Sequence, residues 1–295
     1  MPEHVEIIEV GPRDGLQRES EFIPTAQKIA MINALSDAGI PRIQVTSFVH
    51  AKYVPQMADA EAVCGGIRQQ PGVIYSGLVL NLKGLERAAD TGLKAVDMSV
   101  SASDSHSRKN ANVSLEDALQ NFKGMVARAR ELGMMVRAGI QCAFGYYEPD
   151  VTHDLVVDIA KRHLALNIDE LALADSTGMA SPAQIKALLA EIIPLAGKVP
   201  VILHLHDTRG MGLANVLAAL DGGCRYFDTA FGGLGGCNFI EQATGNIATE
   251  DTVNMLHEIG YQTGIDVSKV AEVSQSIQQQ ISQPLTGKMY KLLAN

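Results

Sequence analysis

The feature that most constrains the fold of this chain is a repeated alternation of short β-rich runs with longer segments of helical periodicity. The β-rich runs lie near residues 4–10, 42–48, 73–80, 95–101, 135–142, 170–175, 199–205 and 226–231. Amphipathic segments separate them, among them 25–38, 114–132, 154–167, 182–196 and 211–223. Largely apolar strands that alternate with helices predict a parallel sheet with crossover helices. About eight is the number at which such a sheet closes into a barrel.

The segment after the first strand argues against the main alternative, an open doubly wound sheet. Such sheets usually place a GxGxxG turn there to bind a phosphate. This chain instead reads Gly11-Pro12-Arg13-Asp14-Gly15. We therefore predict an α/β fold of the (β/α)8, or TIM-barrel, type. No low-complexity linker divides residues 1–295, so we expect one barrel domain over about 4–262 and a C-terminal helical extension over about 263–295.

Composition narrows the environment and the partners of the chain. Its formal charge of −9 argues against a general nucleic-acid binder, although local cations can still hold a small anionic ligand. No run of about 18 apolar residues suggests a membrane span, and the N-terminus lacks the pattern of a signal peptide. The cysteines are scattered without a CxxC pair, which favours reduced thiols. We expect a cytoplasmic protein without membrane or nucleic-acid partners.

Polar residues gather after several predicted strands. In a barrel of this type the functional residues lie at the carboxyl ends of the strands. The candidates at these positions are Glu9, Arg13, Asp14, Asp175, His204, His206, Asp207, the glycine-rich stretch 232–236, Cys237 and Asn246.

The pair His204 and His206 carries the strongest local signal. Residues two apart on a strand point to the same side, so both imidazoles can face the barrel mouth. With the carboxylate of Asp14 they would form a divalent-metal site, and an amide oxygen from Asn246 would favour Mg²⁺ or Mn²⁺. The alternative is a histidine that only hydrogen-bonds inside the barrel.

Arg13, Asp175 and Cys237 each have a structural and a functional interpretation. Arg13 beside Asp14 is either a surface ion pair or a cation that stabilises a developing enolate oxygen. Asp175 is either the N-cap of the following helix or a site residue. The stretch 232–236 is either a long connection or a lid that carries Cys237, whose thiol would then act as an acid or base.

Several longer motifs resemble those of one family. They are Glu9–Gln17 (EVGPRDGLQ), Thr46–Phe48 with Val54–Met57, Asn81–Gly84, His204–Asp207, Gly233–Cys237, Thr244–Asn246 and Ala248–Asp251. In this order, from about residue 5 to 265, they resemble the 3-hydroxy-3-methylglutaryl-CoA (HMG-CoA) lyase family, metal-dependent TIM-barrel enzymes related to Claisen-type synthases. The resemblance implies a lyase that binds an acyl-CoA, and we expect a homo-oligomer, a dimer or a tetramer.

The resemblance also implies roles for individual residues. Metal ligands of the family match Asp14, His204, His206 and Asn246. Its enolate-neutralising arginine matches Arg13, and its catalytic group would further include Asp14, Asp175, His204 and Cys237. The base that removes the hydroxyl proton would be His204, His206 or a group near Asp14. Contacts with the acyl-CoA are expected from Arg13, Gln17, Gln44, Ser47, Asn81 and Lys83.

Two departures from the family pattern bear on the substrate. The family commonly has glutamate where this chain has Gln44, and it has proline and small residues where this chain has 238–242. The leading expectation is cleavage of the C2–C3 bond of HMG-CoA to acetoacetate and acetyl-CoA. A lyase for another branched 3-hydroxyacyl-CoA, such as citramalyl-CoA, is the alternative. So is a Claisen-type acyltransferase like isopropylmalate or homocitrate synthase, although those usually add a C-terminal domain.

Overall fold

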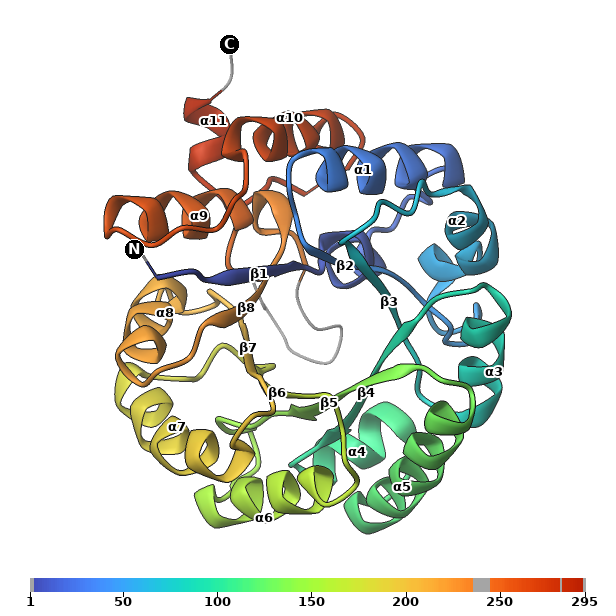
Figure 1. Cartoon of the computed structure of the whole chain (residues 1–295), viewed down its shortest axis with the longest axis vertical. Coiled ribbons are helices and arrows are strands. Elements are labelled where there is room, and N and C mark those ends of the chain that lie inside the picture. The colour runs from blue at the N-terminus through green and yellow to red at the C-terminus, as the bar shows by residue number, and fades with distance from the viewer. Residues whose placement is uncertain (1–2, 236–244, 282, 294–295) are drawn as a thin grey trace.

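The strands form a closed parallel barrel in the computed structural model, which describes residues 3–235, 245–281 and 283–293. Each strand pairs with the next in sequence, and β1 closes the ring by pairing with β8 (Figure 1). The strands are β1 Glu6–Glu9, β2 Arg42–Ser47, β3 Ile74–Leu78, β4 Ala95–Ser101, β5 Met135–Gln141, β6 Glu170–Asp175, β7 Val201–Leu205 and β8 Tyr226–Thr229. The predicted (β/α)8 barrel is confirmed, with every strand in its predicted place.

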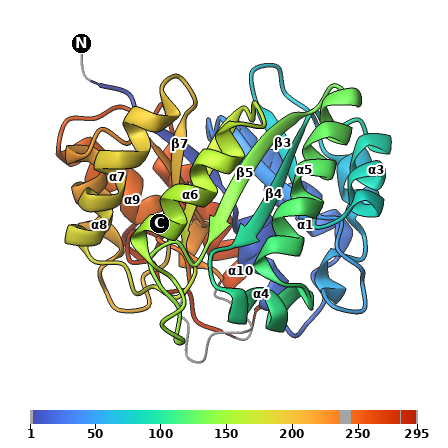
Figure 2. The ribbon, with the colours of Figure 1, turned by 90° about the horizontal axis from the view of Figure 1, so that it is seen from below.

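Helices cover the outside of the barrel. Those that follow the strands are α1 Thr25–Asp37, α2 Ala60–Gly66, α3 Leu82–Asp90, α4 Asp104–Ala111, α5 Leu115–Glu131, α6 His153–Leu164, α7 Pro182–Ala196, α8 Gly212–Asp221 and α9 Thr249–Glu258. Polar caps fix several starts; for example, Ser181 and Gln184 form a capping box ahead of α7. In the side view α4 lies at the carboxyl end of β4 (Figure 2). Within the described part of the chain, no helix is long and apolar enough to cross a membrane.

The C-terminal extension packs on the outside of the barrel. It contains α10 Val267–Gln278, which packs on α1 and α9, and α11 Met289–Leu292 (Figure 1). The segment between them contacts the loop after β8: Gly287 N donates to Gly232 O at 2.9 Å, and Thr286 Oγ1 donates to Gly233 O at 3.0 Å. At Gly232, which has φ +62°, a Cβ would lie 2.6 Å from Leu285 Cδ1. Glycine is therefore required where the extension meets this loop.

The interior of the barrel is more polar than the largely apolar strand pattern suggests. The large apolar core lies between strands and helices, whereas a small apolar cluster is built on Ile8, Val10, Ala172 and Ile202. Charged side chains fill much of the remaining interior, where the guanidinium of Arg42 on β2 reaches the carboxylate of Glu170 on β6. Buried charges must be paired, so the inner face of this barrel is a network of ion pairs. This network extends to the carboxyl end of the strands, which is the mouth of the barrel.

Candidate active site

Arg13 and Asp14 lie on a single π-helical turn, Gly11–Gly15, that follows β1. The turn is held by Asp14 N, which donates to Val10 O at 2.7 Å. At Gly11 a Cβ would lie 2.5 Å from the ring of Phe231, so only glycine lets the turn approach the loop after β8. Both side chains turn inward, and Arg13 Nη1 lies 2.6 Å from Asp14 Oδ1. Because the two side chains are only 12% and 9% exposed, the interpretation as a surface ion pair is wrong.

Asp14, His204 and His206 bring three potential ligand atoms together at the barrel mouth. These atoms lie within 4.8 Å of one another. Each histidine Nε2 is 3.8 Å from Asp14 Oδ2, and the two imidazole centroids are 5.0 Å apart. His204 comes from β7 and His206 directly follows it, so strand alternation places both rings on the same side, as predicted.

Two buried polar atoms beside Asp14 find no hydrogen-bond partner among the described residues. Asn246 Nδ2 donates to Asp14 Oδ2 at 2.8 Å and to Leu234 O at 3.0 Å, which leaves Asn246 Oδ1 unpaired. His206 Nδ1 donates to Ser176 O at 3.1 Å, so in the neutral imidazole the unpaired Nε2 carries the lone pair. Unpaired buried acceptors are costly. Two imidazoles, a carboxylate and an amide oxygen therefore fit a divalent cation.

Charges around the cluster keep its carboxylates ionised. Burial opposes ionisation of Asp14, but the Arg13 guanidinium and the two histidines outweigh it and hold its pKa well below the usual range. Asp228 on β8 lies 3.0 Å from His204 Nδ1. Burial would raise the pKa of Asp228, yet the charge of Arg137 and the His204 contact lower it to about 2. A carboxylate behind a histidine fixes the ring and its tautomer, so Asp228 orients His204.

Gln44 forms a hydrogen bond with Arg13, and Gln17 forms one with Asp14. Gln44 Oε1 accepts a hydrogen bond from Arg13 Nε, and Gln44 Nε2 donates to Asp97 Oδ2 at 2.6 Å. Gln17 Nε2 donates to Asp14 Oδ1 at 2.8 Å. Both side chains thus contact the residues expected to act on substrate.

The remaining predicted residues lie in different parts of the mouth. Asp175 accepts from Met179 N at 2.8 Å and Ala180 N at 3.1 Å; since Ser181 caps α7, the N-cap interpretation of Asp175 is wrong. Burial raises the pKa of Asp175. Ser47 is buried, and its Oγ accepts from Val49 N at 3.3 Å. Cys237 lies outside the described residues.

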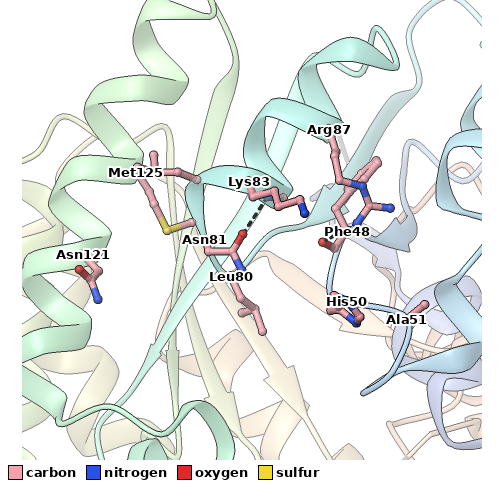
Figure 3. A pocket seen from close by; sticks show the side chains of 11 residues that line it. Phe48, His50, Ala51, Leu80, Asn81, Lys83, Arg87, Asn121 and Met125 are labelled. Atoms are coloured by element: carbon pink, nitrogen blue, oxygen red, sulfur yellow. Dashed lines mark hydrogen bonds between the residues drawn. The ribbon is translucent and has the colours of Figure 1, made fainter.

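A pocket of about 680 Å³ opens between α3, α5 and the loop after β2. Figure 3 shows Asn81 and Lys83 on one side of this pocket, with Met125 and Asn121 of α5 across from them. Asn81 caps α3 by accepting from Gly84 N at 2.8 Å, and Lys83 is exposed. Phe48 and Arg87 complete the neighbouring wall. The structure thus brings the predicted Asn81 and Lys83 together at an open pocket.

Sequence reasoning singled out Glu9 but missed its contacts. Its carboxyl group is completely buried, and its oxygens accept from Gly11 N at 2.7 Å, Phe231 N at 3.1 Å and Thr249 Oγ1 at 2.7 Å. Glu9 therefore joins the turn that carries Arg13 and Asp14 to the loop after β8 and to α9. Burial, the dominant effect, raises its pKa to about 8.

The raised pKa of Glu9 predicts a pH-dependent stability. Between about pH 5 and 8 the folded protein retains a proton on Glu9 that the unfolded chain has lost, so this contribution to stability disappears as the pH rises through 8. We expect Glu9→Gln to reduce the pH dependence of the free energy of unfolding by up to about 1.4 kcal/mol per pH unit in this range. Urea unfolding at pH 6, 7 and 8 measures this, and parallel curves for both proteins would contradict it.

The barrel and its donor cluster define a class: (β/α)8-barrel proteins with a candidate divalent-metal centre at the carboxyl end of the strands. The chain belongs to the HMGL-like family, whose model matches residues 4–277. It is 41% identical to the cytoplasmic 3-hydroxy-3-methylglutaryl-CoA lyase of Rattus norvegicus, over 98% of this chain and 84% of that protein. It is 40% identical to the mitochondrial hydroxymethylglutaryl-CoA lyase of the same species, over 98% of this chain and 89% of that protein.

A solved structure agrees with these sequence relatives. The structure of an HMG-CoA lyase from Acinetobacter baumannii in complex with coenzyme A and 3-methylmalate superposes with a TM-score of 0.94. The two chains are 37% identical, and the match covers 98% of this chain and 94% of that one. The family resemblance of the sequence motifs is thereby confirmed.

Proposed function

We propose that this protein is a divalent-metal-dependent lyase that cleaves the C2–C3 bond of 3-hydroxy-3-methylglutaryl-CoA to acetoacetate and acetyl-CoA. The observation that carries the proposal is the cluster of Asp14, His204 and His206 with the unpaired Asn246 Oδ1 beside it. These four residues would hold Mg²⁺ or Mn²⁺. Full-length relatives named as lyases of this substrate support the same reaction.

The residues of the mouth have separable tasks in this reaction. A cation held by Asp14, His204, His206 and Asn246 would supply Lewis acidity to oxygens of the substrate. His204 would take the proton of the 3-hydroxyl group on Nε2 once that nitrogen is free of the cation, since Asp228 at its Nδ1 stabilises the imidazolium that forms. As the C2–C3 bond breaks, C3 becomes the ketone carbon and the electron pair passes to the thioester enolate. Arg13 stabilises the enolate oxygen, and we assign protonation of C2 to Cys237.

The pocket beside α3 is proposed to bind the coenzyme A portion. Lys83 would pair with a phosphate there, so Lys83→Ala is expected to raise KM about fivefold to tenfold and to leave kcat unchanged. The reason is that a contact remote from the reacting atoms stabilises substrate and transition state equally. Lys94→Ala, at the exposed amino end of β4, is the matched control. Steady-state kinetics at two salt concentrations test the prediction, and an unchanged KM for Lys83→Ala would refute it.

A panel of acyl-CoA substrates tests the function itself. With Mg²⁺ or Mn²⁺ we expect acetyl-CoA and acetoacetate from HMG-CoA, and loss of this activity with EDTA. Faster release of pyruvate from citramalyl-CoA would establish the other branched substrate instead. Free CoA from acetyl-CoA plus a 2-oxoacid would identify an acyltransferase. Absence of acetyl-CoA from every substrate would refute the lyase proposal.

A further inference from the structure

A buried chain of polar contacts beneath Arg13 includes Asp97, an acid that the proposed mechanism does not use. Asp97 on β4 is 6% exposed, and its Oδ2 accepts from Gln44 Nε2 and from Ser76 Oγ, each at 2.6 Å. Its Oδ1 lies 3.6 Å from Arg137 Nε. Two side chains, Gln44 and Arg13, lie between Asp97 and the candidate metal ligand Asp14. On the other side, Arg137 and Asp228 lie between Asp97 and His204.

The chemistry of the two neighbours fixes the orientation of the Gln44 amide. On one side stands a carboxylate, which can only accept, and on the other a guanidinium, which can only donate. Gln44 must therefore turn its NH₂ group toward Asp97 and its carbonyl toward Arg13 Nε. A bulge between β2 and β3 at Gln44 and Thr46 helps to aim the side chain.

Arg13 is consequently held at two of its nitrogens. Gln44 Oε1 accepts from Nε, and Asp14 Oδ1 lies 2.6 Å from Nη1. Two contacts along different edges fix the plane of a guanidinium. Gln44 is neutral, so the charge that orders its amide comes from Asp97.

We propose that Asp97 is a positioning residue that acts through Gln44 to set the orientation of Arg13. This proposal rests on the proposed function, in which Arg13 stabilises the enolate. Asp97 does not touch substrate in this scheme. It ensures that the acceptor end of the Gln44 amide faces Arg13.

The Asp97→Asn variant tests this relay, the chain of contacts from Asp97 through Gln44 to Arg13, because an asparagine cannot present an oxygen to both Gln44 and Arg137. If its oxygen faces Gln44, its NH₂ group meets Arg137 Nε–H. If its NH₂ group faces Gln44, that amide must turn its own NH₂ group toward Arg13 Nε–H. The second arrangement displaces the guanidinium, and a displacement of about 1 Å lowers the rate about 100-fold. We expect kcat to fall about tenfold to 100-fold and KM to change less than about threefold.

Exchanging the amide and the acid between positions 44 and 97 restores the pattern of hydrogen-bond donors and acceptors between these two side chains and Arg13. Gln44→Glu alone places two buried carboxylates in contact and is expected to lower both kcat and Tm. In the double variant Gln44→Glu/Asp97→Asn, the new amide donates to the new carboxylate, which accepts from Arg13 Nε. We expect kcat within about threefold of the wild-type value, far above the product of the two single effects. A residue that only supported the fold would not show this recovery.

A matched control and a second readout complete the experiment. Ser76→Ala removes the other hydrogen bond to the same Asp97 oxygen and leaves Gln44 in place, so kcat should stay within about twofold. The Arg13 Nε–H signal in ¹⁵N NMR spectra, identified by its loss in Arg13→Lys, reports the contact without turnover. We expect slow proton exchange in the wild-type protein and the double variant, and fast exchange in Asp97→Asn.

The outcomes separate the two proposals. Absence of lyase activity in the wild-type protein would refute the function, while the NMR exchange pattern would still test the relay. Wild-type kcat and slow exchange in Asp97→Asn would overturn the relay. Multiplicative losses in the double variant, or a loss in Ser76→Ala equal to that in Asp97→Asn, would overturn it as well.

Discussion

His206→Ala should lower metal-dependent cleavage by at least about 1000-fold while the protein remains folded. The Nε2 atom of His206 is buried beside Asp14 and lacks a hydrogen-bond partner in the described structure, so its lone pair is available to a cation. Besides its packing against the His204 ring, the side chain gives the fold the hydrogen bond from Nδ1 to Ser176 O, which contributes about 1 kcal/mol. Metal binding, rather than stability, is therefore the property that this variant should lose.

Calorimetric titration with Mn²⁺ measures the affinity directly, and release of acetyl-CoA measures turnover. His153→Ala is the matched control, because His153 pairs with Glu191 on the surface of α6 and α7. We expect it to bind Mn²⁺ and turn over as the wild-type protein does. Unchanged Mn²⁺ affinity in His206→Ala would show that the cation is held elsewhere. A collapsed circular dichroism spectrum would show instead that His206 maintains the fold.

Local patterns in the sequence were sufficient to predict the barrel and the pair of histidines. Strand and helix periodicities are properties of short segments, and each strand was located from its own residues. His204 and His206 share a side because strand alternation has a period of two. Asp14 and Asn246 both follow barrel strands in the sequence, and closure of β1 against β8 brings them together.

The supporting contacts could not be predicted in the same way. Asp97, Arg137 and Asp228 lie on β4, β5 and β8, so their contacts depend on the tilt and register of a closed sheet. The sequence shows only that a charged side chain lies within a buried strand. Such a side chain requires a partner of opposite charge, but the sequence does not identify that partner. Gln44 shows the same limit. Its sequence position suggested a contact with substrate, whereas the structure engages both ends of its amide with protein side chains.

Arg13→Lys should lower kcat about 100-fold to 1000-fold and leave the Mn²⁺ affinity within about threefold of the wild-type value. Lysine retains the positive charge beside Asp14, so the carboxylate remains compensated and able to bind the cation. It has one nitrogen, however, and cannot contact Asp14 and Gln44 together while presenting a further donor to the enolate. The variant should therefore show whether turnover needs only a positive charge at position 13 or also the shape and orientation of the guanidinium.

The same two measurements as for His206→Ala decide this prediction. His206→Ala is expected to lose Mn²⁺ binding and turnover together, whereas Arg13→Lys is expected to lose turnover alone. Wild-type kcat in Arg13→Lys would mean that a single positive charge is sufficient and that the orientation imposed through Gln44 has no catalytic consequence. Loss of Mn²⁺ binding would assign Arg13 to the support of Asp14. The expected combination, bound cation with little turnover, requires the fork of the guanidinium at the position where the enolate oxygen forms.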